Sequence, residues 1–292
     1  VLRGPQGTLY GRNATGGSVN IITNRPVSEF HAGLNVTLGN YETINTDGFI
    51  NGALSNTVSA RLSFQTQHHS GYGENIVTGS DIDNKNSQAI RGQLLFEPDD
   101  KLSILVAADY YRSSDRSNSY HYFRPGGETL DGDPVVPTGL LLGGIANSDP
   151  RDVAMAHDPK TQSEFYGARA DISYNLSDSV TLRSLSAYRY SKYRVIGDIS
   201  PISFEIFPLR GREKSNQYTQ EFQLNVDSDR NKLVSGVFYM HENIDAFLGG
   251  ALNLIALGGP DLLMQGFYSG GRLKTDAAAI YAQDTYSVTD RF

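Results

Sequence analysis

The sequence predicts an all-β fold, a partial transmembrane antiparallel β-barrel that follows a short glycine-rich N-terminal segment. Three observations lead to this prediction. Apolar and polar residues alternate with a period of two along most of the chain, short turns alternate with long polar loops, and aromatic residues gather near both ends of the expected strands. No stretch approaches the roughly 18 continuous apolar residues that a membrane helix needs.

The N-terminal segment, residues 1–23, contains five glycines between two short apolar stretches. Glycine permits tight turns and close approach of backbones, so the segment is expected to form a compact unit. Val19, Ile21 and Ile22 are expected to form a short strand that closes this unit.

A phosphate-binding loop is the competing interpretation of Gly11 to Ser18. Such a loop needs a lysine before its hydroxyl residue, and here Gly17 stands in that place. A phosphate loop also opens a helix, whereas residues 19–23 look extended. Nucleotide binding is therefore disfavoured, and a glycine-rich turn without a ligand remains an alternative.

Long strands follow from residue 30 onward. About ten strands of roughly ten residues or more are expected, longer than the usual strand of a soluble protein. The apolar files, in chain order, include Phe30 to Leu38, Val58 to Phe64, Ile90 to Phe96, Leu102 to Tyr110, Tyr166 to Leu176, Val180 to Tyr190, Tyr218 to Val226, Leu233 to His241, and Asp276 to Val288. The alternation is blurred in 180–190 and 233–241, but the composition there still favours strands.

The connections between these strands alternate in length. Short turns are expected near residues 55–57, 98–101, 177–179, 227–231 and 289–291. Long loops are expected at about 71–85, 112–161, 191–211 and 242–274. An outer-membrane barrel has short turns on one side and long loops on the other, whereas a sandwich mixes loop lengths at both ends.

Aromatic residues favour the same arrangement. Phe96, Tyr174 and Tyr286 lie near the short turns, and a second group lies near the long loops: Tyr110, Tyr166, Tyr188 and Tyr190. Two such belts are typical of a barrel anchored at both membrane interfaces. The alternative is that tyrosine and phenylalanine simply favour strands.

The sequence motifs of the N-terminal segment resemble those of a known family. Arg-Gly-Pro, then Tyr-Gly, then Gly-Gly followed by Asn-Ile-Ile-Thr closely resembles the join between plug and barrel in TonB-dependent outer-membrane receptors. The resemblance implies that residues 1–26 end a plug domain and that 27–292 form the N-terminal part of the barrel. The implied plug residues are Arg3, Gly4, Pro5, Tyr10, Gly11, Arg12, Gly16 and Gly17.

The resemblance also implies a function, which is active uptake of a scarce nutrient across the outer membrane of a Gram-negative cell. Ferric siderophores are the commonest substrates of the family. The implied partners are outer-membrane lipid, a small-molecule ligand, and the TonB energy-transducing complex, which would act through an N-terminal region absent from this chain. Plugged barrels need about 22 strands, so the chain is expected to be an internal fragment with two open sheet edges.

Ligand-contact candidates lie where the strand that ends near Tyr110 enters the longest loop. They are Tyr111, Tyr120, His121, Tyr122 and Arg124. Aromatic faces beside an arginine suit siderophores, sugars or aromatic compounds. The alternative is that these residues form an aromatic girdle and pack the loop.

The sequence offers no catalytic residues, cofactor or metal site. No nucleophile–base pair stands out. His68 and His69 are adjacent in a strand and point to opposite faces, so they cannot easily share a metal ion. Asp81 and Asp83 lack the oxygen ligand and glycine that a calcium loop would place after them. The chain is therefore not expected to be an enzyme.

Composition sets further bounds. The formal net charge of −7 argues against a nucleic-acid partner, and the absence of cysteine excludes disulfides and thiolate metal sites. Two other functions remain open. An unplugged passive porin would not need the glycine-rich opening, and a soluble β-rich binding or adhesion protein would have long loops at both ends of its strands.

Overall fold

The computed structural model describes residues 2–3, 16–19, 21–117, 120, 140, 144–145, 149–200, 202–252 and 265–288. Strands dominate this part of the chain. They are β1 (Leu2–Arg3), β2 (Gly17–Ser18), β3 (His31–Gly39), β4 (Thr43–Ala53), β5 (Val58–His69), β6 (Gly73–Asn75), β7 (Ser80–Ile82), β8 (Lys85–Phe96), β9 (Leu102–Asp115), β10 (Lys160–Ser177), β11 (Val180–Asp198), β12 (Pro208–Asp227), β13 (Asn231–Leu252) and β14 (Gln265–Tyr286). Among the described residues, no helix is long and apolar enough to cross a membrane.

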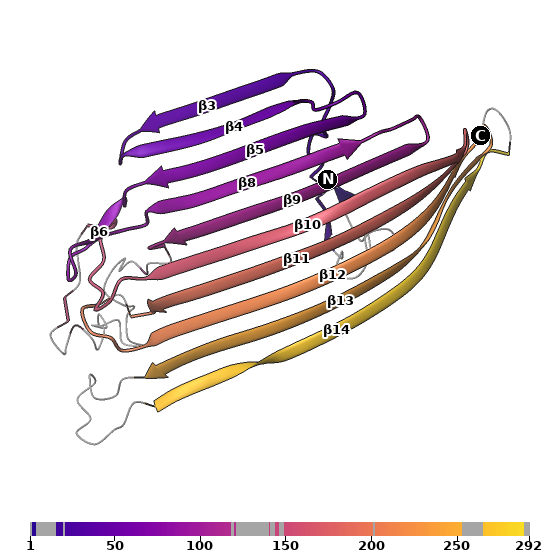
Figure 1. Cartoon of the computed structure of the whole chain (residues 1–292). Coiled ribbons are helices and arrows are strands. Elements are labelled where there is room, and N and C mark those ends of the chain that lie inside the picture. Colours follow the sequence, from indigo (N-terminus) through magenta and orange to yellow (C-terminus); the bar gives the residue numbers. More distant parts are fainter. Residues whose placement is uncertain are drawn as a thin grey trace.

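Ten of these strands form one antiparallel sheet in the order β14-β13-β12-β11-β10-β9-β8-β5-β4-β3. Neighbours in the sheet are neighbours in the chain, apart from the β6–β7 hairpin inserted between β5 and β8. Figure 1 shows the strands side by side in a curved sheet, with the short turns at one end and the loops at the other. The sheet is open, with β3 and β14 at its edges, so the predicted all-β architecture is confirmed.

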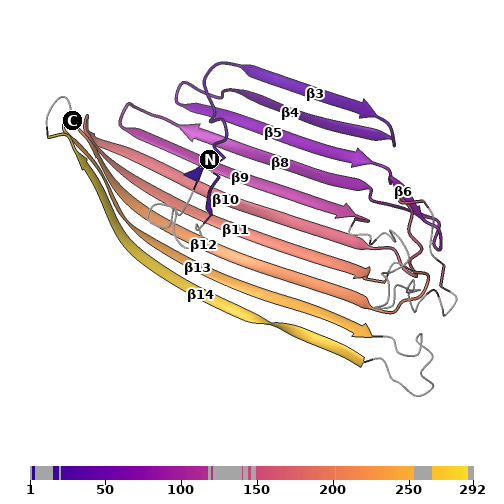
Figure 2. The ribbon, with the colours of Figure 1, turned by 180° about the vertical axis from the view of Figure 1, so that it is seen from behind.

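The strands lengthen along the chain, from 9 residues in β3 to 22 in β13 and β14. A tilted strand needs about 9–11 residues to cross a bilayer. The later strands are therefore well beyond that length, and both views show the strands becoming longer from β3 toward β14 (Figures 1 and 2).

One face of the sheet is apolar, as the alternation predicts. Cross-strand pairing aligns Leu62 on β5 with Ile50 on β4, and Leu94 on β8 with Val106 on β9. These side chains are about half exposed, and no second layer of the described residues covers them. Residues at alternate positions form a polar face on the other side of the sheet.

Tyrosines form a continuous row on the apolar face at its loop-side border. We call Tyr110, Tyr166, Tyr188, Tyr190 and Tyr218 the tyrosine row. Tyr166 pairs in register with both Tyr110 and Tyr190, and Tyr188 pairs with Tyr218. The rings of Tyr166 and Tyr190 stack with centroids 4.6 Å apart. The aromatic group predicted near the long loops is thus contiguous in space.

The structure corrects the predicted lengths of two loops. Residues 191–211 and 242–274 were expected to be long loops, but β11 continues to Asp198, β12 begins at Pro208, β13 continues to Leu252 and β14 begins at Gln265. The cause is that backbone pairing continues beyond the apolar band, where exposed positions become polar and the apolar alternation that marks a strand in the sequence disappears.

The structure also corrects the expected N-terminal strand. Val19, Ile21 and Ile22 lie outside any strand, and the short strand of this segment is β2 at Gly17–Ser18. Leu2 pairs with Ser18 and Arg3 pairs with Gly17. Two-residue pairing leaves the apolar side chains that follow exposed rather than part of a sheet.

A small hydrophobic core lies among the loops. Ile82 of β7 packs with Val153 and Met155 from the connection between β9 and β10, and all three are almost fully buried. The loops that precede β8 and β10 are therefore docked on one another at the loop end of the sheet.

Candidate functional site

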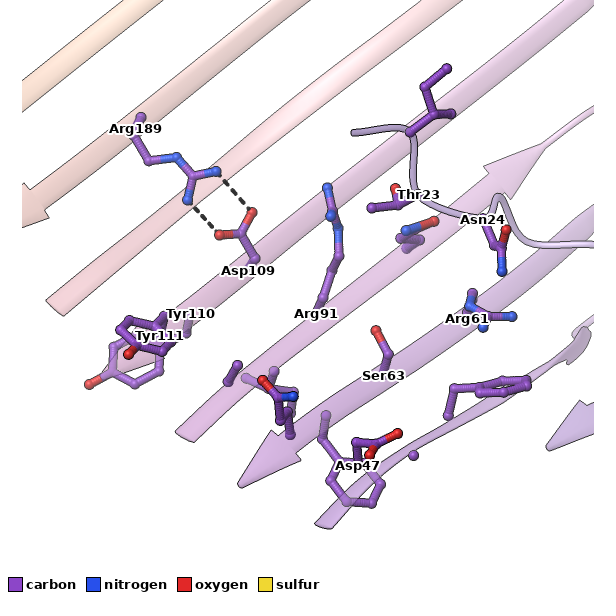
Figure 3. A pocket seen from close by; sticks show the side chains of 18 residues that line it. Thr23, Asn24, Asp47, Arg61, Ser63, Arg91, Asp109, Tyr110, Tyr111 and Arg189 are labelled. Atoms are coloured by element: carbon purple, nitrogen blue, oxygen red, sulfur yellow. Dashed lines mark hydrogen bonds and ion pairs between the residues drawn. The ribbon is translucent and has the colours of Figure 1, made fainter. Parts of the chain in front are cut away.

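A cavity of about 620 Å³ lies between the N-terminal segment and the polar face of the sheet. Ile22, Thr23 and Asn24 line one side of it. The opposite wall comes from β4, β5, β8, β9 and β11 (Figure 3). The charged side chains in this wall are Asp47, Arg61, Arg91, Asp109 and Arg189.

Arg189 and Asp109 form an ion pair that spans three strands. Asp109 on β9 and Arg189 on β11 both stand in register with Gly167 on β10. Because Gly167 has no side chain, the guanidinium crosses over β10, and its Nη1 lies 2.5 Å from Asp109 Oδ2. A Cβ atom at Gly167 would lie 2.7 Å from the Tyr188 carbonyl oxygen and 3.2 Å from Arg189 Cζ. Figure 3 shows both hydrogen bonds of the pair.

The same geometry recurs near the short-turn end of the polar face. Tyr281 on β14 reaches over Gly236 on β13 and donates a hydrogen bond to Glu221 on β12. Arg183 binds Asp171 on the neighbouring strand with two hydrogen bonds of 2.8 and 2.7 Å. Glycine on a middle strand thus lets long side chains link three strands.

Arg91 is the least satisfied cation of the cavity. It stands in register with Asp109, but that carboxylate binds Arg189. Arg91 Nε is buried and has no hydrogen-bond partner among the described residues. Arg169 and Arg189 lie within electrostatic reach and repel its charge, and Asp109 offsets part of this repulsion. An unpartnered buried N–H group is costly, and an anion or polar ligand in the cavity would satisfy it.

Arg61 uses its charge differently. Its guanidinium carbon lies 3.9 Å from the centre of the Phe49 ring, in a cation–π contact on the cavity wall. Such a contact stabilises a cation without neutralising it. The cavity wall therefore keeps a positive balance, with three arginines and two aspartates.

The predicted ligand-contact residues are only partly described. Tyr111 lines the cavity and stacks on Phe165 with ring centroids 5.6 Å apart, on the face opposite its neighbour Tyr110. Tyr120 lies in the loop and is half exposed. His121, Tyr122 and Arg124 lie outside the described residues. Tyr111 is thus the candidate that the structure brings to the cavity.

The predicted plug residues are likewise described in part. Arg3 and Gly17 pair in register between β1 and β2, and Gly16 precedes β2. Gly4, Pro5, Tyr10, Gly11 and Arg12 lie outside the described residues. The assignment of this segment to a plug stays a prediction.

Asn75 links the two docked loops at the loop end of the sheet. Its amide nitrogen donates to the Met155 carbonyl and to Asp158 Oδ1, both at 3.0 Å, and its oxygen accepts from the Met155 N–H at 3.0 Å. Burial raises the pKa of Asp158, but hydrogen bonds from Thr78, Ser80 and Asn75, together with Arg116, outweigh it and hold this pKa below its ordinary value.

His68 and His69 end β5, as expected. Their side chains diverge, and the His69 ring stacks on Tyr72 with centroids 4.5 Å apart. Among the described residues, no group of three or more histidine, aspartate or glutamate side chains is placed to hold a metal ion.

Sequence reasoning missed Arg61, Arg91, Asp109 and Arg189 as site residues. The alternation assigns each of these residues to the polar side of its strand. That their side chains meet in one cavity depends on the cross-strand register, which a single sequence does not reveal. The glycine at 167 was the available signal, because a strand glycine marks close approach of other groups.

No family model matches the chain. Among solved structures, it is similar to the ferric yersiniabactin uptake receptor FyuA from Yersinia pestis, with a TM-score of 0.65, 17% identity and coverage of 99% of this chain and 49% of that one. The siderophore receptor PiuA from Acinetobacter baumannii gives a TM-score of 0.70 at 14% identity, covering 98% of this chain and 44% of that one. The ferric-catecholate import receptor Fiu from E. coli K12, in its closed form, gives 0.68 at 16% identity, covering 99% and 43%.

These neighbours are TonB-dependent siderophore receptors. The chain spans less than half the length of each. At such low identity the similarity establishes the fold alone, which is that of part of a β-barrel receptor. The fold class predicted from the sequence is therefore confirmed.

Proposed function

We propose that this chain is the plug–barrel junction and first part of the barrel of a TonB-dependent receptor, which imports a ferric siderophore across the outer membrane. In this proposal residues 1–26 end the plug and 27–292 begin the barrel. The chain contributes binding and a route through the membrane, and it catalyses no covalent chemistry.

One observation carries the proposal: the N-terminal residues lie on the polar face of a sheet whose other face is apolar and exposed. Ile22 to Asn24 share a cavity with Arg61 and Arg91 on the polar face. On the apolar face, Leu62, Leu94 and Val106 are 44–50% exposed. In a plugged barrel the outer face of the sheet is apolar and contacts lipid, and the inner face contacts a folded peptide segment.

Membrane physics supports further strands in the complete gene product. In hydrocarbon every backbone N–H and C=O must be paired, so strands span a bilayer only as a closed barrel. The outer edges of β3 and β14 are free for such pairing among the described residues. Outer-membrane lipid is then the partner of the apolar face, and the energy-transducing complex acts from the opposite side on the plug.

The cavity supports an anionic chelate as the ligand. Arg91 offers a buried, unpartnered N–H, and Tyr111 offers an aromatic face on the same wall. Ferric complexes of catecholate or carboxylate ligands carry negative charge, and catecholates add planar aromatic surface. Cationic and aromatic side chains together suit that chemistry.

Uptake by cells tests the proposal. Deleting the gene should abolish growth on one ferric siderophore under iron limitation, and the complete gene product should restore it. Uptake should stop when a protonophore collapses the inner-membrane gradient. Uptake that survives the protonophore, or large steady conductance in planar bilayers, would instead indicate a passive porin. Recovery of the protein without detergent would indicate a soluble binding protein.

A further inference from the structure

Residues 25–30, which we call the linker, connect the N-terminal segment to β3. The chain before the linker lines the cavity on the polar face, and Figure 3 shows it running past Thr23 and Asn24 across the strands of the wall. Arg25 lies within electrostatic reach of Asp171, whose side chain projects from β10 on the same face. The linker therefore runs along the polar face before the chain enters the edge strand.

The side chain of Asn51 on β4 binds the linker backbone. Its Oδ1 accepts a hydrogen bond from the Val27 N–H at 3.1 Å. Its Nδ2 donates to the carbonyl oxygens of Val27 and Glu29, at 3.1 and 2.9 Å. A side-chain amide carries one acceptor oxygen and two N–H donors, so the amide is fully used by one short stretch of backbone. Asn51 thus pairs with the linker as the peptide group of a neighbouring strand would.

Burial shows that Asn51 is committed to these bonds. The residue is only 1% exposed, whereas most polar side chains on this face are accessible. Asparagine is depleted in strands, and a buried amide is costly unless it is hydrogen-bonded. A residue with these costs in the middle of β4 is explained by the backbone that it holds.

Two further features hold the linker at the same point. The Ala53 N–H donates to the Ser28 carbonyl at 3.1 Å, which continues the contact with β4 beyond the start of β3. Pro26 is fully buried, and its ring restricts the backbone just before Val27. The chain from Val27 onward is therefore bound to the sheet at several places.

The chain on the other side of Pro26 is held differently. Residues 21–25 lie outside any strand. Ile21 and Ile22 are 83% and 84% exposed, so their apolar side chains contribute little packing against the wall. The change from loosely packed to hydrogen-bonded chain falls at Pro26 and Val27.

We propose that Asn51 is a positioning residue for transport, which fixes the linker to the sheet so that the chain before Pro26 rearranges during uptake while the chain from Val27 onward stays in place. A pull from the N-terminal side then acts on the bonds of Asn51 before it reaches the end of β3. The edge strand is thereby protected from being peeled away from β4. The proposal rests on the proposed function only in that the N-terminal segment moves relative to the barrel.

Hydrogen exchange of the complete gene product in detergent gives the first test. Asn51→Leu keeps the approximate size of the side chain and removes all three bonds, so the protection factor of the Val27 N–H should fall at least about tenfold. The matched control is Asn45→Leu on the same strand, which removes the bond that Asn45 Oδ1 accepts from the His68 N–H at 3.2 Å near the loop end. The control should leave Val27 unchanged. The smaller polar variant Asn51→Ser loses the same bonds and gives the comparison if the leucine variant does not fold.

Pulling on the N-terminal end of the complete gene product in a bilayer, with optical tweezers, gives the second test. In the wild type, forces that leave the barrel intact should release the chain only as far as Pro26. Asn51→Leu should release residues 27–30 as well. These four residues lengthen the released chain by about 14 Å, at about 3.3–3.6 Å for each extended residue.

Uptake separates positioning from a purely structural role. In Asn51→Leu the affinity for the ferric siderophore should be unchanged, whereas the uptake rate per folded receptor should fall. A residue that only stabilised the fold would lower the amount of folded receptor and leave the rate per folded receptor unchanged, and that result would overturn the proposal.

Equal protection of the Val27 N–H in Asn51→Leu and the wild type would also overturn it, and so would equal released lengths in the pulling experiment. A wild-type release that runs past Val27 while the barrel is intact would have the same consequence. Exchange and pulling need no siderophore, so a failure of the proposed transport function is distinguishable from a failure of the linker to be held by Asn51.

Discussion

Arg189 on β11 binds Asp109 on β9 across the intervening strand, with Nη1 2.5 Å from Oδ2. The pair closes over Gly167 and fixes the polar wall of the cavity. It also commits the carboxylate that stands nearest to Arg91 in register, which leaves Arg91 Nε unpartnered in the described part of the chain. Stability of the wall and charge of the cavity are thus coupled through Asp109.

Replacing Asp109 with asparagine should destabilise the barrel. Arg189 then loses its ion-pair partner and Arg91 loses the attraction of the same carboxylate, and we expect the free energy of unfolding to fall by about 1–2 kcal/mol after allowing for solvent screening of half-exposed groups. Urea unfolding of the complete gene product in detergent measures this. Asp227→Asn, which breaks the exposed pair with Lys232 at 3.6 Å, is the control and should change little. Equal effects of the two variants would contradict a structural role for Asp109.

Gly167→Ala should destabilise by about 1–3 kcal/mol, because the added methyl group collides with the Tyr188 carbonyl and displaces the Arg189 guanidinium. Gly92→Ala is the matched control, since a Cβ atom there meets nothing within 4 Å. That control should be neutral or stabilising by about 0.4–1 kcal/mol. The midpoint of urea unfolding compares them, and a tolerated alanine at 167 would show that the crossing does not need glycine.

Arg91→Gln should weaken ligand binding without weakening the fold. The change removes a charge-assisted hydrogen bond to the ligand, which corresponds to about a 10- to 100-fold loss of affinity. It also relieves repulsion from Arg169 and Arg189, so the unfolding midpoint should hold or rise. Isothermal titration with the ferric siderophore that the uptake assay of the proposed function selects measures the affinity. Arg230→Gln, at a short turn, controls for charge. Unchanged affinity in Arg91→Gln would show that Arg91 does not contact the ligand.

Particular residues show how far the sequence predicts the molecule. Alternation identifies Leu94 and Val106 as one apolar surface, and the structure pairs them in register. Alternation does not predict that β11 continues beyond Tyr190, because a strand that carries polar side chains beyond the apolar band has the composition of a loop. Alternation also does not predict the contact between Arg189 and Asp109, which are 80 positions apart, because that contact depends on the register of three strands.

The two faces of the sheet make opposite predictions for an added charge. Val106→Lys places an ammonium on the apolar face between Leu94 and Ala170, where it should cost about 2–4 kcal/mol in a bilayer. Ser103→Lys places the same charge on the polar face near Glu97, which accepts a hydrogen bond from the Ser103 hydroxyl at 3.0 Å, and should be tolerated. Folding yield into lipid vesicles measures both, and equal yields would mean that the apolar face does not meet lipid.

The docked loops should loosen in acid because of Asp158. Hydrogen bonds from Thr78 and Asn75 at 2.6 and 3.0 Å stabilise its ionised form, and they more than offset the burial that raises its pKa. A carboxyl whose pKa is lower folded than unfolded stabilises the fold fully above its unfolded value of about 3.9, and that stabilisation disappears as the pH falls through the folded value. Docking should therefore weaken as the pH drops below about 4.

Hydrogen exchange at Ile76 and Val153 reports the docking. The Ile76 N–H binds the Val153 carbonyl at 2.9 Å, and the Val153 N–H binds the Glu74 carbonyl at 3.0 Å. Their protection factors, corrected for intrinsic exchange rates, should fall more steeply between pH 6 and about 3 in the wild type than in Asp158→Asn, which has no carboxylate to protonate. Parallel pH profiles in the two proteins would assign the acid sensitivity to another group, because the hydrogen bonds around Asp158 would then be indifferent to its charge.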